Sequence, residues 1–148
     1  MPSQHIVCPQ CHSVNRVPSE RLSESPKCGA CKAALIGGLP VDLDRRTFHT
    51  HVERNDLPVC VDFWAPWCGP CRAMAPVFVQ AAVALRGHAL LAKVNTEAEP
   101  QLASQFAIRS IPTLIMFRGG REVDRISGTL DAPRLNAWIN RWLGKVQA

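Results

Sequence analysis

Two cysteines separated by Gly69 and Pro70 are the residues best placed to do chemistry in this chain. Cys68 and Cys71 follow an apolar run at 59–64, whose length and composition predict a buried strand. They open a segment whose apolar residues recur with the spacing of an amphipathic helix: Cys71, Met74, Ala75, Phe78, Ala81, Ala82 and Leu85. Cysteines one helical turn apart can form a disulfide with little backbone movement. The pattern therefore predicts a disulfide-forming pair at a strand-to-helix junction.

The position of this pair at a helix start predicts different roles for its members. The dipole and free N–H groups of a helix N-terminus favour a thiolate, and the thiolate is the form that attacks disulfides. Cys71 lies on the apolar side of the predicted helix, whereas we expect Cys68 to be exposed at its tip. We therefore predict thiol–disulfide exchange in which Cys68 attacks and Cys71 resolves the mixed disulfide. Pro70 fits the first turn, where a missing N–H costs nothing, and Gly69 leaves room for a partner's backbone.

A charged residue interrupts each of two predicted strands. Asp62 stands among Val, Phe and Trp, where burial would raise the pKa of its carboxyl group. Such a group suits a proton acceptor for Cys71. Lys93 interrupts the predicted strand 89–95 in the same way. Each also has a plainer interpretation, since Asp62 could be a capped or solvent-facing strand residue and Lys93 could extend from a strand edge into water.

The residues around the cysteine pair also carry a family resemblance. Val61-Asp62-Phe63-Trp64-Ala65 followed by Trp67-Cys68-Gly69-Pro70-Cys71 is similar to the thioredoxin signature, and Lys93-Val94-Asn95 and Ile111-Pro112-Thr113 match two other landmarks of that family. The resemblance covers roughly residues 38–148. It implies that Asp62 and Lys93 lie near each other, where an ion pair would couple the titrations of Asp62 and Cys71. It also implies that the peptide bond before Pro112 is cis. The substrate groove that it implies is lined by Trp67, Gly69, Pro70, Ile111, Pro112 and Gly128.

The other predicted elements surround this motif. Strands are expected near 39–41, 89–95, 114–117 and 122–127, and helices at 45–55 after an Asp44 cap, from Cys71 to about Arg86, at 97–106 and at 132–143. Gly119-Gly120 predicts a hairpin turn, and Gly128 either permits close approach by a partner or marks a bulge. Parallel crossovers followed by a terminal hairpin predict an α/β fold, a central mixed sheet with helices on both faces. The resemblance implies the same thioredoxin fold.

Two further sequence features have plain interpretations. Cys60 alternates with valines in the predicted strand and is expected to be a small buried apolar residue. Members of the family often carry Asp where this chain has Glu97. We expect that departure to affect helix capping, for which Asn95 or Thr96 is available, and not the chemistry.

Four more cysteines near the N-terminus form a second candidate site. They are Cys8, Cys11, Cys28 and Cys31, with a spacing typical of four-cysteine zinc sites. So short a segment cannot bury a useful core without a metal. We therefore predict one zinc ion, in a zinc-ribbon-like module at 1–36 that precedes a thioredoxin domain at 37–148. Two further redox pairs or an iron–sulfur cluster are alternatives, and His5 or His12 could also supply ligands.

Composition limits the classes of function that remain. The chain has 148 residues, 47% hydrophobic and 20% charged, which is typical of a globular protein. Its net charge of +5 includes no run of like charges, so a nucleic-acid surface is not expected. Neither a secretory leader nor an apolar run of membrane-spanning length is evident. We therefore expect a cytoplasmic, reducing setting, in which paired cysteines are more often metal ligands or redox centres than structural disulfides.

The resemblance implies a thioredoxin that reduces protein disulfides and is recharged by an NADPH-dependent thioredoxin reductase, and we expect a monomer. The four-cysteine module resembles that of the bacterial zinc-containing second type. Because no Gly-x-Gly-x-x-Gly fingerprint is present, no bound flavin or nicotinamide is expected. Oxidation of the zinc-binding cysteines to Cys8–Cys11 and Cys28–Cys31 disulfides, with loss of the metal, is a hypothetical regulatory step, beside a purely structural role. A disulfide oxidase or isomerase, and an interaction adaptor built on a thioredoxin scaffold, are the alternative functions.

Overall fold

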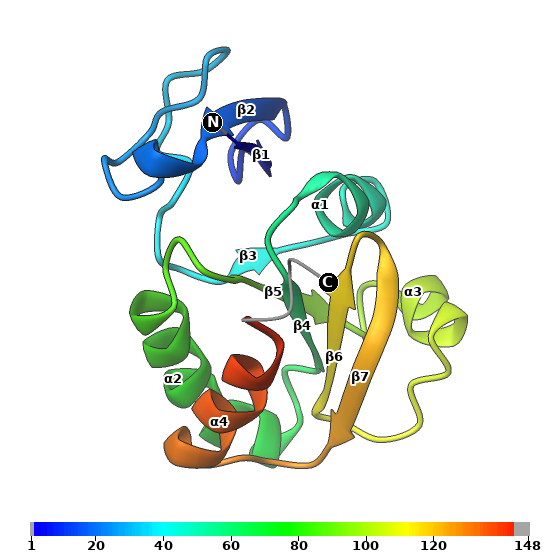
Figure 1. Ribbon diagram of the computed structural model, residues 1–148. Coiled ribbons are helices and arrows are strands. Elements are labelled where there is room, and N and C mark those ends of the chain that lie inside the picture. Colours follow the sequence, from blue (N-terminus) through cyan, green and yellow to red (C-terminus); the bar gives the residue numbers. More distant parts are fainter. Residues whose placement is uncertain (1, 144–148) are drawn as a thin grey trace.

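The computed structural model describes residues 2–143 and contains two separate β-sheets (Figure 1). The small antiparallel sheet consists of β1 (Ser3–Val7) and β2 (Val14–Pro18), followed by the one-turn 3-10 helix η1 (Ser19–Arg21). The large sheet has the strand order β3-β5-β4-β6-β7. Its strands are β3 (Val41–Asp42), β4 (Val59–Trp64), β5 (Leu90–Asn95), β6 (Thr113–Arg118) and β7 (Arg121–Ser127). The first three are parallel and β6 and β7 pair antiparallel, so the predicted mixed sheet is confirmed.

Helices cover both faces of the large sheet. They are α1 (Phe48–Arg54), α2 (Gly69–Ala84), α3 (Pro100–Gln105) and α4 (Ala132–Leu143). Side chains of α2 and α4, such as Phe78 and Ile139, pack in one buried cluster with Cys60 of β4. Side chains of α1 and α3 pack on the other face with Val61 and Phe63. Alternate residues of β4 therefore enter two different cores, as the period of two in a strand requires.

Helix α1 begins later than the sequence pattern predicts. The carboxylate of Asp44 accepts hydrogen bonds from the backbone N–H groups of Arg46 and Thr47, at 2.9 and 3.1 Å. These are the bonds of an N-cap residue, as predicted, and the N–H of Phe48 donates to the carbonyl oxygen of Asp44 at 2.9 Å. Asp44 therefore caps the turn at 45–47, and the regular helix starts after that turn, at Phe48.

The turn between β6 and β7 is the hairpin predicted from its two glycines. Gly119 and Gly120 have φ angles of 58° and 83°, which glycine adopts without steric cost. A Cβ atom on Gly120 would lie 3.0 Å from Cγ of Glu53, so the turn packs closely against α1. A side chain at Gly120 would therefore require the Glu53 side chain to shift, in addition to adopting a strained φ angle.

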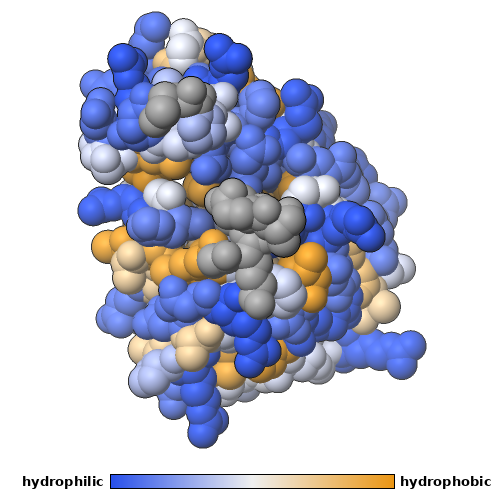
Figure 2. Space-filling model, viewed as in Figure 1, coloured by the Kyte–Doolittle hydropathy of each residue, from blue (hydrophilic) through white to orange (hydrophobic). Residues whose placement is uncertain are grey.

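The N-terminal segment, residues 2–36, lies next to the end of α1 (Figure 1). Beside it, a hollow of about 470 Å³ separates the segment from α2 and is lined in part by the connecting residues 33–42. On the face shown in Figure 2, apolar side chains appear below the segment at the left of the view. The two sheets are thus joined across a partly open junction.

We predict that Asp124 of β7 anchors the C-terminal helix. Its Oδ2 accepts hydrogen bonds from the indole N–H groups of Trp138 and Trp142, at 2.9 and 3.0 Å. Asp124→Ala would leave both partly buried donors without this acceptor and is expected to lower the free energy of unfolding by about 2–4 kcal/mol. Asp124→Asn keeps a side-chain oxygen and should cost less. Urea denaturation measures both, and a change below about 0.5 kcal/mol for the alanine variant would contradict this role.

Candidate active site and metal centre

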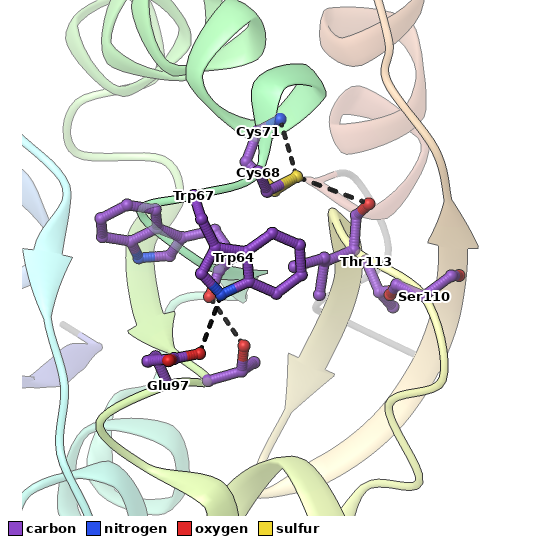
Figure 3. Close-up of a disulfide and its surroundings, with 9 residues drawn as sticks. Trp64, Trp67, Cys68, Cys71, Glu97, Ser110 and Thr113 are labelled. Carbon is purple, nitrogen blue, oxygen red and sulfur yellow. Dashed lines mark hydrogen bonds between the residues drawn. A yellow bond between two sulfur atoms is a disulfide. The ribbon is translucent and has the colours of Figure 1, made fainter.

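Cys68 and Cys71 lie at the start of α2, where the sequence pattern places them. Cys68 is the N-cap residue, and its sulfur accepts a hydrogen bond from the backbone N–H of Cys71 at 3.2 Å (Figure 3). The two residues form a disulfide, with their Cα atoms 5.3 Å apart. Pro70 occupies the first turn of the helix. The helix N-terminus therefore directs an N–H donor at the sulfur that we expect to carry the thiolate.

The expectation that Cys68 is exposed is wrong. Its exposed fraction is 5%, compared with 2% for Cys71, and both pack with Ala65, Trp64 and Ile111. The loop before β6 covers Cys68, whose sulfur lies 3.8 Å from the carbonyl oxygen of Ile111. What distinguishes the two cysteines is therefore this position beside a backbone carbonyl at the helix tip, and not their accessibility.

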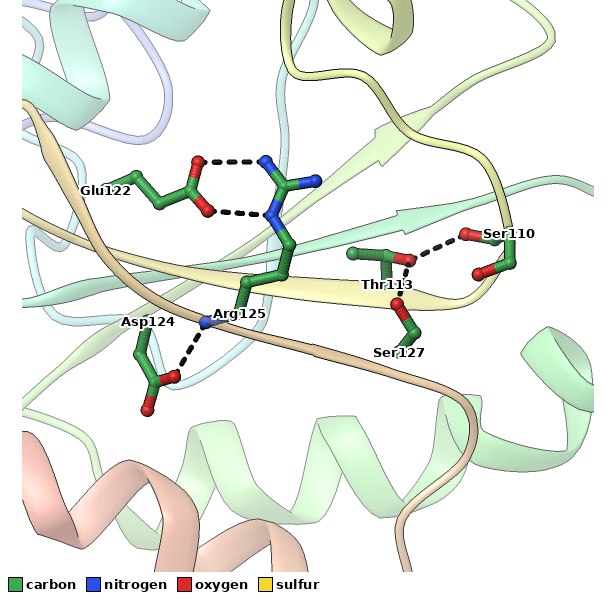
Figure 4. A network of polar contacts seen from close by, with 6 residues as sticks. All are labelled: Ser110, Thr113, Glu122, Asp124, Arg125 and Ser127. Carbon is green, nitrogen blue, oxygen red and sulfur yellow. Dashed lines mark hydrogen bonds and ion pairs between the residues drawn. The ribbon is translucent and has the colours of Figure 1, made fainter.

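The loop beside the disulfide contains the cis Ile111-Pro112 peptide bond that the resemblance implies. The buried hydroxyl of Thr113 donates a hydrogen bond to the carbonyl oxygen of Ser110 at 2.6 Å (Figure 4). The same hydroxyl lies 3.2 Å from Oγ of Ser127 on β7. These contacts join the end of the loop to the first residue of β6 and to β7, next to Cys68.

Two of the predicted groove residues are glycines that leave open space. A Cβ atom added to Gly69 or Gly128 would meet no atom within 4 Å. The backbone N–H of Gly128 donates to the carbonyl oxygen of Pro112 at 2.9 Å, and its φ of 96° disfavours any other residue. The irregularity in the β6–β7 pairing lies between Met116 and Phe117, so Gly128 does not mark a bulge.

Trp67 is the exposed member of the predicted groove, at 66%. Its indole N–H donates to Oε2 of Glu97 at 2.8 Å (Figure 3). This contact with a predicted groove residue is additional to the expected effect on helix capping. Oδ1 of Asn95 accepts from the N–H groups of Glu97 and of the next residue, and the carbonyl oxygen of Asn95 accepts from the N–H of Glu99 at 2.9 Å. Asn95 therefore makes the expected capping bonds, for a turn that precedes the start of α3 at Pro100. The carboxylate at this position was the available signal for a contact with Trp67.

Asp62 is buried on the face of the sheet that α2 and α4 cover. It alternates with Cys60, which belongs to the core of that face, and is only 1% exposed. Its Oδ1 atom has no hydrogen-bond partner among residues 2–143. Burial raises the pKa of Asp62 to about 7, while the positive charge of Lys93 acts in the opposite direction. The solvent-facing interpretation of Asp62 is therefore wrong.

Lys93 is the register partner of Asp62 in the β4–β5 pairing. The proximity that the resemblance implies is thus present in the backbone. Within the described part of the chain, however, their charged atoms form no ion pair within 4.0 Å. The ammonium group of Lys93 lies 4.3 Å from the ring centroid of Trp64 instead, a cation–π contact. Its charge therefore acts on Asp62 from a greater distance than expected.

Cys60 is the remaining cysteine of the large sheet, and it is fully buried without a disulfide partner. Burial raises the pKa of its thiol, and the charge of nearby Asp62 adds to that effect. A buried neutral thiol is unreactive, as predicted from its alternation with valines.

The four N-terminal cysteines converge at one point. Their sulfur atoms all lie within 4.8 Å of one another, and the pairs Cys8–Cys31 and Cys11–Cys28 are each 3.6 Å apart. Tetrahedral zinc, with Zn–S bonds of about 2.3 Å, requires neighbouring sulfurs at about 3.8 Å. The donor set and its dimensions therefore fit a four-thiolate zinc site.

Two loops of nearly the same conformation present these cysteines. In the first, the N–H of His12 donates to the carbonyl of Cys8 at 3.0 Å, and in the second the N–H of Lys32 donates to that of Cys28 at 3.0 Å. His12 and Lys32 both have positive φ angles, 65° and 69°. Backbone N–H groups also point at the two buried sulfurs, at 3.3 Å from Gln10 to Cys8 and 3.3 Å from Ala30 to Cys28. Such donors stabilise thiolates.

The two candidate histidine ligands contact residues outside the N-terminal segment instead of the cysteine sulfurs. His5 lies 3.1 Å from Oδ2 of Asp56, and His12 lies 2.9 Å from Nε2 of His51. Neither belongs to the cluster of sulfurs. Both histidines instead connect the N-terminal segment to the end of α1.

Known protein families match both parts of the chain. The thioredoxin family model matches residues 40–141, and the zinc-ribbon model described as "Thioredoxin 2, N-terminal" matches residues 7–33. Thioredoxin C-3 of Corynebacterium nephridii is 44% identical over 96% of this chain and 97% of its own length. Thioredoxin 1 of a Nostoc species is 48% identical over 66% of this chain and 91% of its own. The solved structure of a mutant thioredoxin from Halobacterium salinarum aligns with a TM-score of 0.66 and 30% identity, covering 72% of this chain and 92% of that one.

Proposed function

The chain belongs to the thioredoxin family, in the type that carries an N-terminal zinc ribbon, and we propose that it reduces protein disulfides through Cys68 and Cys71. Its relatives support protein-disulfide reductase activity. The disulfide at the N-terminus of α2, beside the Ile111 carbonyl, is the observation that carries the assignment of residues.

The proposed reaction is two successive thiol–disulfide exchanges. The Cys68 thiolate attacks one sulfur of a substrate disulfide, so that a Cys68–substrate bond forms and the other substrate sulfur leaves as a thiolate. The Cys71 thiol loses its proton to Asp62, and the resulting thiolate attacks the Cys68 sulfur. The Cys68–Cys71 disulfide forms, the second substrate sulfur leaves as a thiolate, and two electrons have passed from the protein to the substrate.

Substrate binding is proposed to use the surface around the disulfide. An extended substrate segment would pair with the backbone of Ile111, next to Pro112, in the manner of β-strand addition. Trp67, held by Glu97, would form one wall of the groove. Gly69, Pro70 and Gly128 would let the substrate backbone approach the disulfide.

The oxidised pair must be reduced again by an external donor. We propose an NADPH-dependent thioredoxin reductase, with flavin and nicotinamide bound by that partner and not by this chain. None of the helices described within residues 2–143 has the length and apolar composition needed to cross a membrane. We propose that the protein is cytoplasmic and monomeric and that it has no nucleic-acid partner.

We also propose that Cys8, Cys11, Cys28 and Cys31 hold one zinc ion, in a module that ends near residue 36. The zinc-ribbon match and the convergence of four sulfurs support this proposal. When bound, zinc would supply a cross-link between the two cysteine loops and no redox chemistry, since its oxidation state does not change. The thiolate ligands themselves can be oxidised, so the module is also a candidate redox sensor.

The function is tested by insulin-disulfide reduction with the intact chain, NADPH and thioredoxin reductase, with zinc quantified in the same sample. We expect turnover that depends on both added components and about one zinc per chain. A reduction potential near the roughly −270 mV typical of thioredoxins supports the reductase, whereas a value above about −180 mV would indicate an oxidase or isomerase. Absence of turnover with a fully reduced active site would contradict the proposal.

Replacing Asp62 with Asn tests the proposed proton acceptor. Because the pKa of Asp62 is raised to about 7, its carboxyl group is ionised and able to accept a proton above that pH. At pH 8 we expect release of the mixed disulfide to be about 10- to 100-fold slower in the variant. At pH 5.5 the two proteins should differ little, because wild-type Asp62 is then protonated. Rapid-quench measurement from pH 5.5 to 8.5 tests this, and equal rates throughout would remove Asp62 from the mechanism.

The same variant has an independent stability signature. The folded protein binds the Asp62 proton more tightly than the unfolded chain, so Asp62 lowers stability progressively as pH rises from about 4 to about 7. Asp62→Asn removes this cost and should raise the free energy of unfolding above pH 7 by up to about 3–4 kcal/mol. The difference should vanish below pH 4. Urea denaturation at several pH values thus checks that the variant is folded.

A further inference from the structure

The apolar core of the N-terminal segment is completed by a residue from outside it. The buried cluster in this region consists of Ile6, Cys8, Val17, Cys28, Leu35 and Leu57. Leu57 belongs to the stretch between α1 and β4, and only 7% of it is exposed. Two other members of the cluster are proposed zinc ligands. The packing around the metal centre therefore depends on the thioredoxin domain.

Asn55 makes the most buried polar contact between the two parts. Its exposed fraction is 2%, and its Oδ1 accepts a hydrogen bond from the backbone N–H of Val7 at 2.8 Å. Its Nδ2 donates to the carbonyl oxygen of His51, also at 2.8 Å, at the end of α1. Val7 directly precedes Cys8. One side chain thus joins the last turn of α1 to the backbone next to the first cysteine.

Additional contacts hold both flanks of the Cys8–Cys11 loop. On one side, the N–H of Asp56 donates to the carbonyl of His5 at 2.9 Å, and Oδ2 of Asp56 accepts from the N–H of His5 at 2.7 Å. On the other side, His12 contacts His51 through their ring nitrogens. The stretch 51–57 therefore touches the chain immediately before and immediately after this loop.

We propose that residues 51–57 form part of the scaffold of the zinc site, with Asn55 and Leu57 as the residues that position the Cys8–Cys11 loop. This inference rests on the zinc site proposed above. Groups that orient the ligands of a metal typically contribute 10- to 100-fold in metal affinity. Coupling between two sites is reciprocal, so bound zinc also stabilises the end of α1 and the stretch that follows it.

The first test is zinc affinity, measured by competition with a chromogenic chelator at one pH. Asn55→Ala in the full-length protein is expected to weaken zinc binding about 10- to 100-fold. Leu57→Ala should weaken it in the same direction. Asn140→Ala is the control for loss of the local bond alone, because the exposed Asn140 on α4 donates to the carbonyl four residues earlier at 2.7 Å, as Asn55 does, and makes no hydrogen bond to the N-terminal segment among the described residues. Insulin reduction by each variant verifies its fold.

The reciprocal test is amide hydrogen exchange in the wild-type protein with and without zinc. Zinc removal should accelerate exchange in residues 51–57 and leave α4 unchanged, and the acceleration should be smaller in Asn55→Ala. An active Asn55→Ala protein that binds zinc within about twofold of wild type would overturn the inference, as would exchange in 51–57 that does not respond to zinc. A wild-type protein that binds no zinc would instead overturn the zinc proposal from which it starts.

Discussion

Cys68→Ser is expected to abolish insulin reduction, with a loss on the order of 10³-fold or more. A serine hydroxyl is not ionised near neutral pH, and no other cysteine can replace the nucleophile beside the Ile111 carbonyl. Cys60→Ala is the control, because Cys60 is fully buried and unpaired. It should keep the wild-type rate. Turnover coupled to reductase and NADPH measures both variants.

Cys71→Ser should behave differently, because the attacking cysteine remains. The first exchange can proceed, but the internal thiolate that releases the substrate is missing. A covalent complex with substrate proteins should therefore accumulate, visible by non-reducing electrophoresis and lost on adding dithiothreitol. If the Cys68 variant traps substrate and the Cys71 variant does not, the two roles are reversed.

The strand and helix that carry the cysteine pair could be predicted because their signals are local. Residues 59–64 alternate between two cores, and the apolar positions after Cys68 repeat with the helical period. The hairpin at Gly119-Gly120 and the convergence of the zinc-type cysteines likewise follow from short-range patterns. In each case the residues that decide the structure are close together in the sequence.

The features that could not be predicted depend on residues far apart in the chain. Cys68 is covered by Ile111, which lies 43 residues later, so no local pattern could show its burial. The bond between Trp67 and Glu97 spans 30 residues, and that between Asn55 and Val7 spans 48. Helix α1 is regular only from Phe48, although Asp44 makes the predicted capping bonds, and apolar periodicity does not report this detail of backbone geometry.

Lys93 lies opposite Asp62 in the sheet, as expected, but it does not form the expected ion pair with it. The strands bring it opposite Asp62, yet its ammonium group lies over the ring of Trp64. Without a direct ion pair, the burial of Asp62 outweighs the attraction of Lys93, and the pKa of its carboxyl group rises to about 7. This places the titration of Asp62 in the pH range where a thiol must lose its proton.

Peroxide treatment of the zinc-loaded protein is expected to release zinc and to unfold the N-terminal segment. Structural zinc contributes about 10–16 kcal/mol in zinc-finger peptides near pH 7, and this segment needs Leu57 from outside to complete its small core. Cys11 and Cys31 are exposed and should be oxidised first, whereas Cys8 and Cys28 are buried. Zinc release, cleavage of the first 36 residues by trypsin and circular dichroism of the remainder measure the effect.

The pairing of the oxidised cysteines provides the sharpest test of this expectation. The sequence suggests disulfides within each Cys-x-x-Cys pair, but the two 3.6 Å sulfur contacts join Cys8 to Cys31 and Cys11 to Cys28. Once zinc has left, we therefore expect the first disulfides to be these cross-pair ones, which peptide mass spectrometry can identify. The experiment uses a Cys68→Ser, Cys71→Ser double variant, so that only the N-terminal thiols react. Zinc that stays bound after Cys11 and Cys31 are oxidised would show that these thiolates are not its ligands. The redox-sensor hypothesis is tested in the chain that keeps Cys68 and Cys71. After peroxide treatment and selective re-reduction of the Cys68–Cys71 disulfide, its rate of insulin reduction is measured. If zinc has been lost and that rate is unchanged, the metal has a structural role only, because a redox sensor must alter the activity that it controls.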